Sequence, residues 1–272
     1  MNDLSRYGPW ALIAGGSEGI GLSFASELAA QGISLILVAR RLAPLESART
    51  QLLADYPNIE VAIQAIDLVA SDLSNQINDI IAGKDIGLLI YNAGATNNID
   101  LFVDESLENI QRLISLNCSG PAVLCHTLGS AMVARGSGGI IIVGSMSGLA
   151  GSAYNATYSA AKAFEMVLAE GLFVELKPRG IDVICLIAGK TDTPSLGRLG
   201  ESLGVLNDSD SMTADDVARE GLMNITNGPV HIAGEENRVG AEFLSADRRQ
   251  ATQLLSSATA QMYSRPYPFE PD

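Results

Sequence analysis

The chain has 272 residues, of which 47% are hydrophobic and 18% charged, and its formal net charge at pH 7 is -14. A chain of this length can bury a large core, and one α/β domain of this size is ordinary. The acidic balance argues against nucleic-acid binding, because phosphate backbones require a basic face. The first residues form no signal peptide and the apolar runs are too short to span a bilayer, so we expect a soluble, cytoplasmic protein.

Short apolar runs alternate with longer helical segments along the chain. The predicted strands are Trp10–Ala14, Ser34–Ala39, Glu60–Ala65, Gly87–Tyr91, Gly139–Gly144, Asp182–Ile187 and Val230–Ala233. The predicted helices are Gly19–Gln31, Pro44–Tyr56, Ser71–Ala82, Leu107–Leu116, Gly120–Arg135 and Tyr158–Lys177. The strands are apolar throughout rather than alternating, which is typical of a parallel sheet covered on both faces. We therefore predict one doubly wound α/β domain over residues 1–272, with seven mostly parallel strands and ligands at their carboxyl ends.

The segment Gly189–Met212 breaks this rhythm, because it is rich in Gly, Ser and Asp with scattered leucines. A connection of this length beside a strand end is often an active-site lid, and we expect a substrate lid over 189–225.

The cysteines and histidines indicate no special chemistry. Cys118, Cys125 and Cys185 form no CxxC pair and are expected to be small buried residues in a reducing compartment. No group of His, Cys and Asp has metal-ligand spacing, so we predict no metal site, and His126 and His231 are expected to be structural.

A glycine-rich stretch, "AGGSEGIG" at residues 14–21, joins the first predicted strand to the first predicted helix. Gly15, Gly19 and Gly21 permit a tight turn and let backbone N–H groups approach a pyrophosphate at the helix N-terminus. The spacing is G-x-x-x-G-x-G, not the G-x-G-x-x-G of the common dinucleotide fingerprint. Glycines also occur in plain strand-to-helix turns, so it is the βα context that favours a dinucleotide site.

This spacing, together with later motifs in the same order, resembles the short-chain dehydrogenase/reductase family over about residues 8–235. The matching stretches are "YNAG" (91–94), "NCSG" (117–120), "GSMSG" (144–148), "YSAAK" (158–162) and "AGKTDT" (188–193). The chain departs from the family pattern at Ala14, Tyr91 and Ala188, which are supporting or cofactor-contact positions. The resemblance implies a Rossmann fold and an oxidoreductase with a nicotinamide cofactor. The opening stretch "RYGPWALIAGGSEGIG" also resembles the branch of ketoacyl reductases and hydroxysteroid dehydrogenases.

A tyrosine and a lysine lie four residues apart in "YSAAK", so a helix would place Tyr158 and Lys162 on one face. An ammonium beside a phenol favours the phenolate, so Tyr158 could give a proton to a ketone oxygen or take one back from an alcohol. Ser145, at a strand's carboxyl end, could hydrogen-bond the same oxygen. The resemblance implies these roles and adds Asn117 as a fourth catalytic residue, which holds a water beside Lys162.

Two arginines, Arg40 and Arg41, follow the second predicted strand, where NAD enzymes usually carry a carboxylate for the ribose. A guanidinium suits a 2′-phosphate by geometry and charge, so we expect NADP(H) to be preferred over NAD(H), with Arg40 as the main contact. A solvated charge pair is the alternative, and the acidic Glu18 is a contrary sign. With the resemblance, the expected cofactor residues also include Gly15, Ser17, Gly19, Ile20, Gly21, Asp67, Leu68, Asn92, Ala93, Gly94, Tyr158, Lys162, Gly189, Thr191 and Thr193.

The candidate substrate residues are Ser145, Leu149, Tyr154, Tyr158 and Leu196, and the apolar ones among them suit an apolar carbonyl compound. We therefore expect an NADPH-dependent reductase of a ketone or 3-ketoacyl compound. Three alternatives stay open: a dehydrogenase that oxidises an alcohol or steroid, a non-catalytic NADP-sensing regulator, and an epimerase or dehydratase, which would require a longer C-terminal substrate domain.

The predicted helix Tyr158–Lys177 is apolar on too many sides for one packed face, with Ala160, Ala161, Ala163, Phe164, Met166, Val167 and Leu168 running around it. One side can cover the sheet and the other requires a partner helix. We therefore expect a homodimer or homotetramer.

Overall fold

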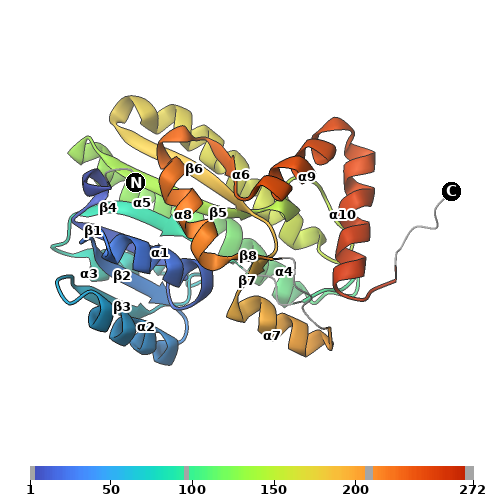
Figure 1. Cartoon of the computed structure of the whole chain (residues 1–272), viewed down its shortest axis with the longest axis horizontal. Helices are drawn as coiled ribbons and strands as arrows, with labels where there is room; N and C mark the ends of the chain where they lie inside the picture. Colours follow the sequence, from blue (N-terminus) through green and yellow to red (C-terminus); the bar gives the residue numbers. More distant parts are fainter. Residues whose placement is uncertain (1–3, 95–97, 206–210, 267–272) are drawn as a thin grey trace.

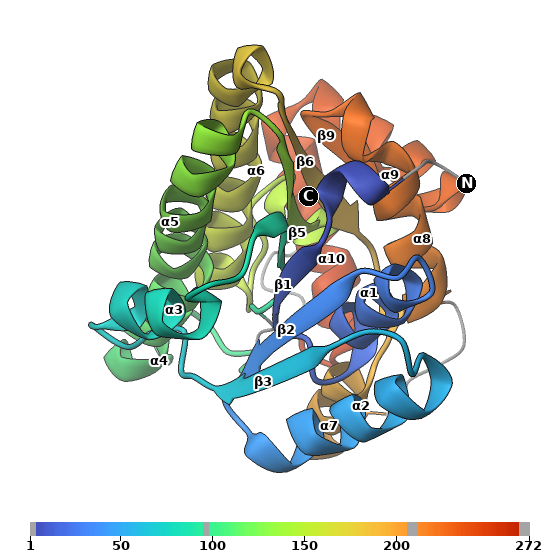
Figure 2. The same cartoon turned by 90° about the vertical axis from the view of Figure 1, so that its left-hand side faces the viewer.

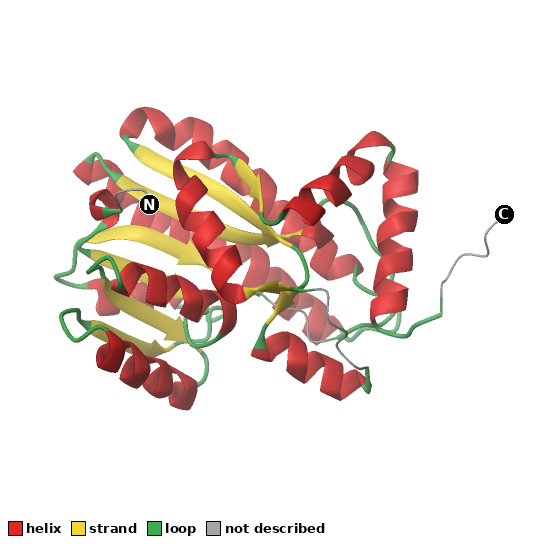
Figure 3. Cartoon of the chain, viewed as in Figure 1, coloured by secondary structure: helices red, strands yellow, loops and turns green. Residues whose placement is uncertain are grey.

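Seven parallel strands form the central sheet, in the order β3-β2-β1-β4-β5-β6-β9 (Figures 1 and 3). The strands are β1 Trp10–Ala14, β2 Ser34–Ala39, β3 Val61–Ala65, β4 Ile86–Tyr91, β5 Gly138–Ser145, β6 Ile181–Ala188 and β9 Val230–Ile232. The computed structural model describes residues 4–94, 98–205 and 211–266. The predicted seven-stranded doubly wound fold is confirmed, and each of the seven predicted strands begins and ends within one residue of the observed one.

Helices cover both faces of the sheet, as Figure 2 shows. On one face lie α1 Gly19–Ala29, α2 Leu42–Asp55 and α8 Ala214–Asn224; on the other lie α3 Leu73–Ile81, α5 Gly120–Arg135 and α6 Ala156–Leu176. Successive residues of β1 point to opposite layers, since Ala11 and Ile13 belong to one core cluster while Leu12 and Ala14 belong to the other. Burial on both faces explains why the strands are apolar throughout.

Residues 189–225, expected as a lid, contain more regular structure than the composition suggested. They include β7 Thr191–Asp192, α7 Pro194–Leu203, β8 Met212–Thr213 and α8. Helix α7 begins where the Thr193 hydroxyl accepts the Leu196 N–H and Pro194 takes the first helical position. Helix α8 packs on α1 in the core, which leaves 189–213 for the predicted lid. Residues 206–210 of that segment lie outside the described residues.

Two further helices, to which the sequence analysis assigned no element, follow β9. Helix α9 spans Glu235–Ala246 and α10 spans Arg248–Met262, and both lie beyond the carboxyl ends of the strands (Figure 1). The Asp247 carboxylate caps α10 by accepting the Gln250 N–H at 2.9 Å. In the described parts of the chain, no helix combines the length and the apolar character that crossing a bilayer would require.

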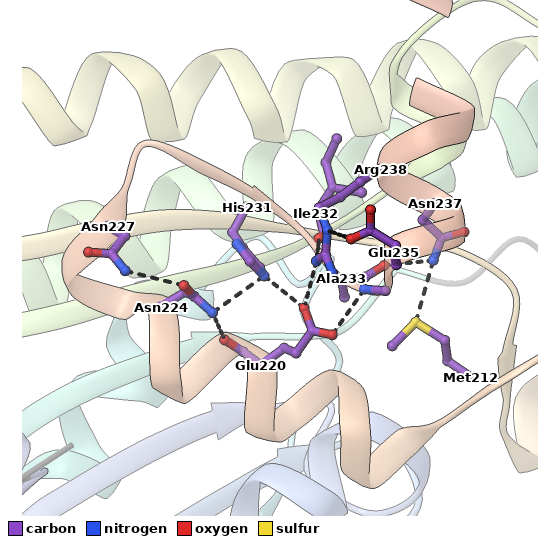
Figure 4. Close-up of polar contacts among 11 residues, drawn as sticks. Met212, Glu220, Asn224, Asn227, His231, Ile232, Ala233, Glu235, Asn237 and Arg238 are labelled. Atoms are coloured by element: carbon purple, nitrogen blue, oxygen red, sulfur yellow. Dashed lines mark hydrogen bonds and ion pairs between the residues drawn. The ribbon is translucent and has the colours of Figure 1, made fainter. Parts of the chain in front are cut away.

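A carboxylate on α8 joins α8, β9 and α9 (Figure 4). Oε2 of Glu220 lies 2.8 Å from Nε2 of His231 and 3.1 Å from Nη1 of Arg238, while Oε1 accepts the Gly234 N–H at 3.1 Å. Burial disfavours the carboxylate, but these neighbours outweigh it, and the pKa of Glu220 is lowered. The carboxylate therefore fixes α9 to the edge of the sheet.

We expect Glu220→Ala to lower the free energy of unfolding by about 1–2 kcal/mol at neutral pH, because several charge-assisted contacts are lost. The pKa of Glu220 is lower in the folded state than in the unfolded chain. Its contribution is therefore complete above the unfolded value and disappears as pH falls through the folded value. Urea denaturation near pH 7 and near pH 3 checks this.

Glu27→Ala is the matched control, because Glu27 on α1 pairs with Arg219 of α8 only at the longer distance of 3.6 Å within the described residues. We expect this control to cost less than about 0.5 kcal/mol. An equal cost in both variants, or a cost of Glu220→Ala that is unchanged in acid, would contradict the assignment.

Candidate active site

A cavity of about 680 Å³ lies at the carboxyl ends of the strands. Its lining includes the turn after β1, the ends of β2 to β6, and residues of α6, α7 and α10. Most of the site residues expected from the sequence line it: Gly15, Ser17, Gly19, Ile20, Arg40, Arg41, Leu68, Asn92, Ala93, Gly94, Ser145, Tyr158, Lys162, Gly189, Thr191, Thr193 and Leu196. The parallel sheet thus brings together residues that are up to 181 positions apart.

The glycine turn after β1 packs directly against the turn after β4. Gly15 has a φ of +83°, and a Cβ there would lie 2.9 Å from the backbone nitrogen of Ala93. A Cβ on Gly21 would overlap the carbonyl oxygen of Gly15, which also accepts the Asn92 side-chain amide at 3.1 Å. Only glycines permit this close approach. The turn leaves the N-terminus of α1, where backbone N–H groups favour an anion, at the cavity.

Four polar side chains gather where β5 meets α6. Tyr158 and Lys162 lie one turn apart on α6, with Nζ of Lys162 5.7 Å from the centre of the Tyr158 ring. Lys162 is only 3% exposed and donates to the Val143 carbonyl at 3.1 Å. Ser145 ends β5 at the cavity, where its hydroxyl accepts the Ser147 N–H at 3.2 Å.

The fourth side chain, Asn117, lies in a π-helical turn, Ser115–Ser119, between α4 (Leu107–Ile114) and α5. Such turns often occur at functional sites. The side chain is fully buried, and its Nδ2 donates to the Leu113 carbonyl at 2.9 Å. Within the described residues, Oδ1 has no hydrogen-bond partner. A Cβ on Gly94 would contact both Asn117 Oδ1 and Lys162 Nζ, so these two groups face the same small space.

Three arginines and one glutamate surround the end of the cavity nearest β2. Glu18 pairs with Arg41 at 2.9 Å and with Arg198 of α7, which also contacts it through Nη1 at 3.2 Å. Burial disfavours the Glu18 carboxylate, yet both arginines outweigh this effect and lower its pKa. Arg40 is exposed and forms no ion pair with any carboxylate in the described parts of the chain. Arg198 was missed because the contact joins residues 180 positions apart.

Some expected site residues lie elsewhere. The Tyr154 hydroxyl donates to the Pro266 carbonyl, and its ring packs with Ile99 and Leu199 rather than lining the cavity. Leu149 packs against Ala150 and Leu244.

Other expected residues act from behind the cavity wall. Oδ1 of Asp67 accepts a hydrogen bond from Arg112 Nη2 at 3.0 Å, while the neighbouring Leu68 lines the cavity. Gly21 and Asn117 also support the wall without lining it.

Helix α10 forms a wall that the sequence analysis did not anticipate. Leu255, Ala258, Thr259 and Met262 of α10, and Tyr263 just after it, line the cavity together with Leu196 and Leu199 of α7. Their spacing of three and four residues is the helical period, and this was the signal that could have found them. Thr259 Oγ1 lies 2.7 Å from Ser152 Oγ, and Ser256 Oγ accepts the Ala153 N–H at 2.9 Å, so α10 is held to the loop after β5.

The sequence profile described as short chain dehydrogenase matches residues 9–203. The chain belongs to this family. A very-long-chain 3-oxoacyl-CoA reductase of Podospora anserina is 33% identical over 191 residues, which are 69% of this chain and 56% of that protein. A protein of Arabidopsis thaliana named as very-long-chain 3-oxoacyl-CoA reductase-like is 34% identical over 187 residues, 68% of this chain and 60% of its own. The chain thus spans little more than half the length of these curated relatives.

Solved structures of the family share the fold. A 7beta-hydroxysteroid dehydrogenase superposes with a TM-score of 0.81 at 26% identity, over 91% of this chain and 96% of its own. A short-chain dehydrogenase from Sphingobium yanoikuyae in complex with NADPH has a TM-score of 0.75 at 29% identity, over 86% and 91% of the two chains. The chain therefore has the fold of short-chain dehydrogenases, a family that uses nicotinamide cofactors.

The residues present fit such a cofactor. The glycine cradle admits a phosphate to the N-terminus of α1, and the arginines supply positive charge beside it. Asn117 Oδ1, which has no hydrogen-bond partner among the described residues, lies behind Gly94 of the cavity wall.

Proposed function

We propose that the protein is an NADPH-dependent reductase that converts an apolar ketone or 3-ketoacyl compound to a secondary alcohol. The observation that carries the proposal is the placement of Tyr158 and Ser145 at one cavity whose far wall is apolar. The names of the curated relatives, very-long-chain 3-oxoacyl-CoA reductases, support a ketoacyl substrate class.

A reduced nicotinamide bound between the glycine turn and Lys162 would supply the hydride. Ser145 donates a hydrogen bond to the carbonyl oxygen and stabilises the charge that develops there. Tyr158 gives the proton that completes the alcohol, and the Lys162 ammonium nearby favours the phenolate that remains. Met146, Leu196, Leu199, Leu255 and Met262 also line the cavity, which favours a substrate with a large apolar part.

A non-catalytic sensor and a reductase differ in what Tyr158 does. We expect Tyr158→Phe to fold and bind NADPH normally but to lose turnover by at least ~100-fold, because only the proton donor is removed. Steady-state oxidation of NADPH with a panel of ketones, ketoesters and acyl thioesters measures this, and the same panel identifies the substrate class.

Tyr56→Phe is the matched control, because it also removes a phenol hydroxyl but lies at the end of α2, away from the cavity lining. Turnover near normal in Tyr158→Phe would remove the tyrosine from the mechanism. A wild-type protein that binds NADPH and reduces no compound of the panel would favour the sensor.

The preference for NADPH rests on the charges beside β2. Ala39 offers no carboxylate to the ribose, and Arg40 follows it directly at the cavity. Glu18 seemed contrary in the sequence, but two arginines neutralise it. Arg41 is bound to Glu18, whereas Arg40 has no ion pair in the described parts of the chain and can meet a 2′-phosphate.

Arg40→Ala is expected to reduce the discrimination between NADPH and NADH by about 10- to 150-fold, because a charged hydrogen bond to phosphate is lost. The Michaelis constant for NADPH should rise, while NADH kinetics stay nearly unchanged. Arg41→Ala serves as the comparison and should have the smaller effect. A wild type that prefers NADH, or an Arg40→Ala variant equally impaired with both cofactors, would refute the assignment.

The protein is also proposed to form homo-oligomers through α6. Phe164, Val167 and Val174 are 39%, 59% and 71% exposed, and their spacing puts them on one stripe of the helix. A partner helix on this stripe would remove apolar surface from water.

We expect light scattering to give a dimer or tetramer for the wild type at micromolar concentration. Val167→Glu should yield monomers, because a buried unpaired charge is costly. Val239→Glu, at a 47% exposed valine on α9, should leave the oligomer intact. A monomeric wild type would exclude this interface.

A further inference from the structure

A second ionisable side chain lies beside the lysine of the site. Glu165, three residues after Lys162 on α6, is completely buried. Its two carboxylate oxygens accept from Lys162 Nζ at 2.8 and 3.1 Å. These are its hydrogen bonds within the described residues, and no other cation pairs with it there. A fully buried carboxylate whose polar partner in the described parts of the chain is the site lysine is unexplained by folding alone, since a buried ion pair rarely adds stability over apolar packing.

The other titratable groups around Glu165 come from four elements packed around α6: Tyr91 on β4, Cys118 in the π-helical turn, Cys125 on α5 and Cys185 on β6. Burial, and then the charge of Glu165, raise the pKa of each of them, and for the Cys125 and Cys185 thiols the pKa reaches about 12. All four are therefore neutral at working pH. Lys162 and Glu165 are therefore the charged pair of this pocket, with Tyr158 as the further titratable group that acts on Lys162.

Lys162 needs a counter-ion to stay charged in this position. An ammonium that is 3% exposed loses its hydration. Buried lysines without a counter-ion can have a pKa several units below the ordinary value. For Lys162 burial is the largest effect and lowers the pKa, but the Glu165 carboxylate reverses it, and the net pKa is raised.

We propose that Glu165 is a positioning residue that keeps Lys162 protonated, so that the ammonium beside Tyr158 persists across the working pH range. The proposal rests on the proposed function, in which that ammonium favours the Tyr158 phenolate. Glu165 does not touch the cavity and acts only through Lys162.

The protonation states of Glu165 and Lys162 are coupled. Burial raises the pKa of Glu165 to about 7, against the opposing effect of Lys162. The Glu165 carboxylate, 2.8 Å from Nζ, stabilises the Lys162 ammonium against loss of its proton. When the carboxylate is replaced by an amide, this stabilisation is lost.

Glu165→Gln tests this by a direct measurement of the lysine charge. The chain has four lysines, so side-chain carbon-13 resonances of labelled lysine are few, and Lys162→Arg assigns the one in question. In the wild type we expect the Lys162 resonance to show no deprotonation below the pH at which the other three titrate. In Glu165→Gln it should titrate at least about 2 pH units lower. This readout needs no substrate.

The second readout is the pH profile of turnover. The ratio of the Glu165→Gln rate to the wild-type rate should fall by at least about 10-fold between roughly pH 6 and pH 9, as Lys162 loses its proton. Glu165→Asp keeps a carboxylate, so the ratio of its rate to the wild-type rate at high pH should be much closer to one than that of Glu165→Gln. Glu165→Met, which places no amide N–H against the ammonium, repeats both measurements if the Gln variant does not fold.

Asp182→Asn is the matched control. Asp182 is a 3% exposed carboxylate that accepts Lys177 Nζ at 2.8 Å and the Tyr7 hydroxyl at 2.8 Å, at the opposite end of the sheet. The Asp182→Asn variant should be less stable than the wild type, and the ratio of its rate to the wild-type rate should not depend on pH. If Glu165→Gln behaves in the same way and Lys162 titrates as in the wild type, the carboxylate is structural and the proposal is wrong. If instead no compound is turned over or Tyr158→Phe stays active, the proposed function fails while the lysine titration still decides the role of Glu165.

Discussion

The parallel pairing of every strand in the main sheet is the constraint on which the site depends. Parallel strands end at the same edge of the sheet, so residues that follow separate strands meet there although they are far apart in the chain. In register, Ala14 at the end of β1 pairs with Tyr91 of β4, and Ser145 of β5 pairs with Ala188 of β6. The residues just beyond these ends form the glycine turn, the floor and the rim of the cavity. A one-residue slip in any pairing would move them apart.

A second constraint sets how closely α6 approaches the end of β5. A Cβ on Gly148 would lie 2.8 Å from the backbone carbon of Lys162, so the short helical turn Met146–Gly148 can pack on α6 only with glycine there. This contact brings the residues after β5 against the turn of α6 that carries Tyr158 and Lys162. The tyrosine and the serine thus come to the same cavity by backbone packing, while the side chains stay free for chemistry.

The sheet and its glycine turn were predictable because their signals are local. Continuous apolar runs bounded by turn residues mark each strand, and Gly120 and Arg135 bound α5 as predicted. Helix α7 was not predicted because Gly197 and Gly200 lower its helix propensity, although the Thr193–Pro194 start was visible.

The parts of the site that escaped prediction depend on contacts between distant residues. The pairing of Glu18 with Arg198 leaves no local trace in the sequence. Tyr154, which was predicted to flank the cleft, has a φ of 62°, and its hydroxyl donates to the Pro266 carbonyl. The residues of α10 were overlooked because no motif accompanies them.

The origin of the α10 wall has a consequence for how such proteins diverge. The groups proposed to handle the proton stand on α6 and β5, whereas this wall belongs to α10, which is hydrogen-bonded to the loop after β5. Substitutions at Leu255, Ala258 or Met262 can therefore change the size and shape of the compound admitted without disturbing the reacting groups. The residues that shape the substrate cavity and the residues proposed to react lie in different segments of the chain, so substrate range can evolve while the reacting residues stay unchanged.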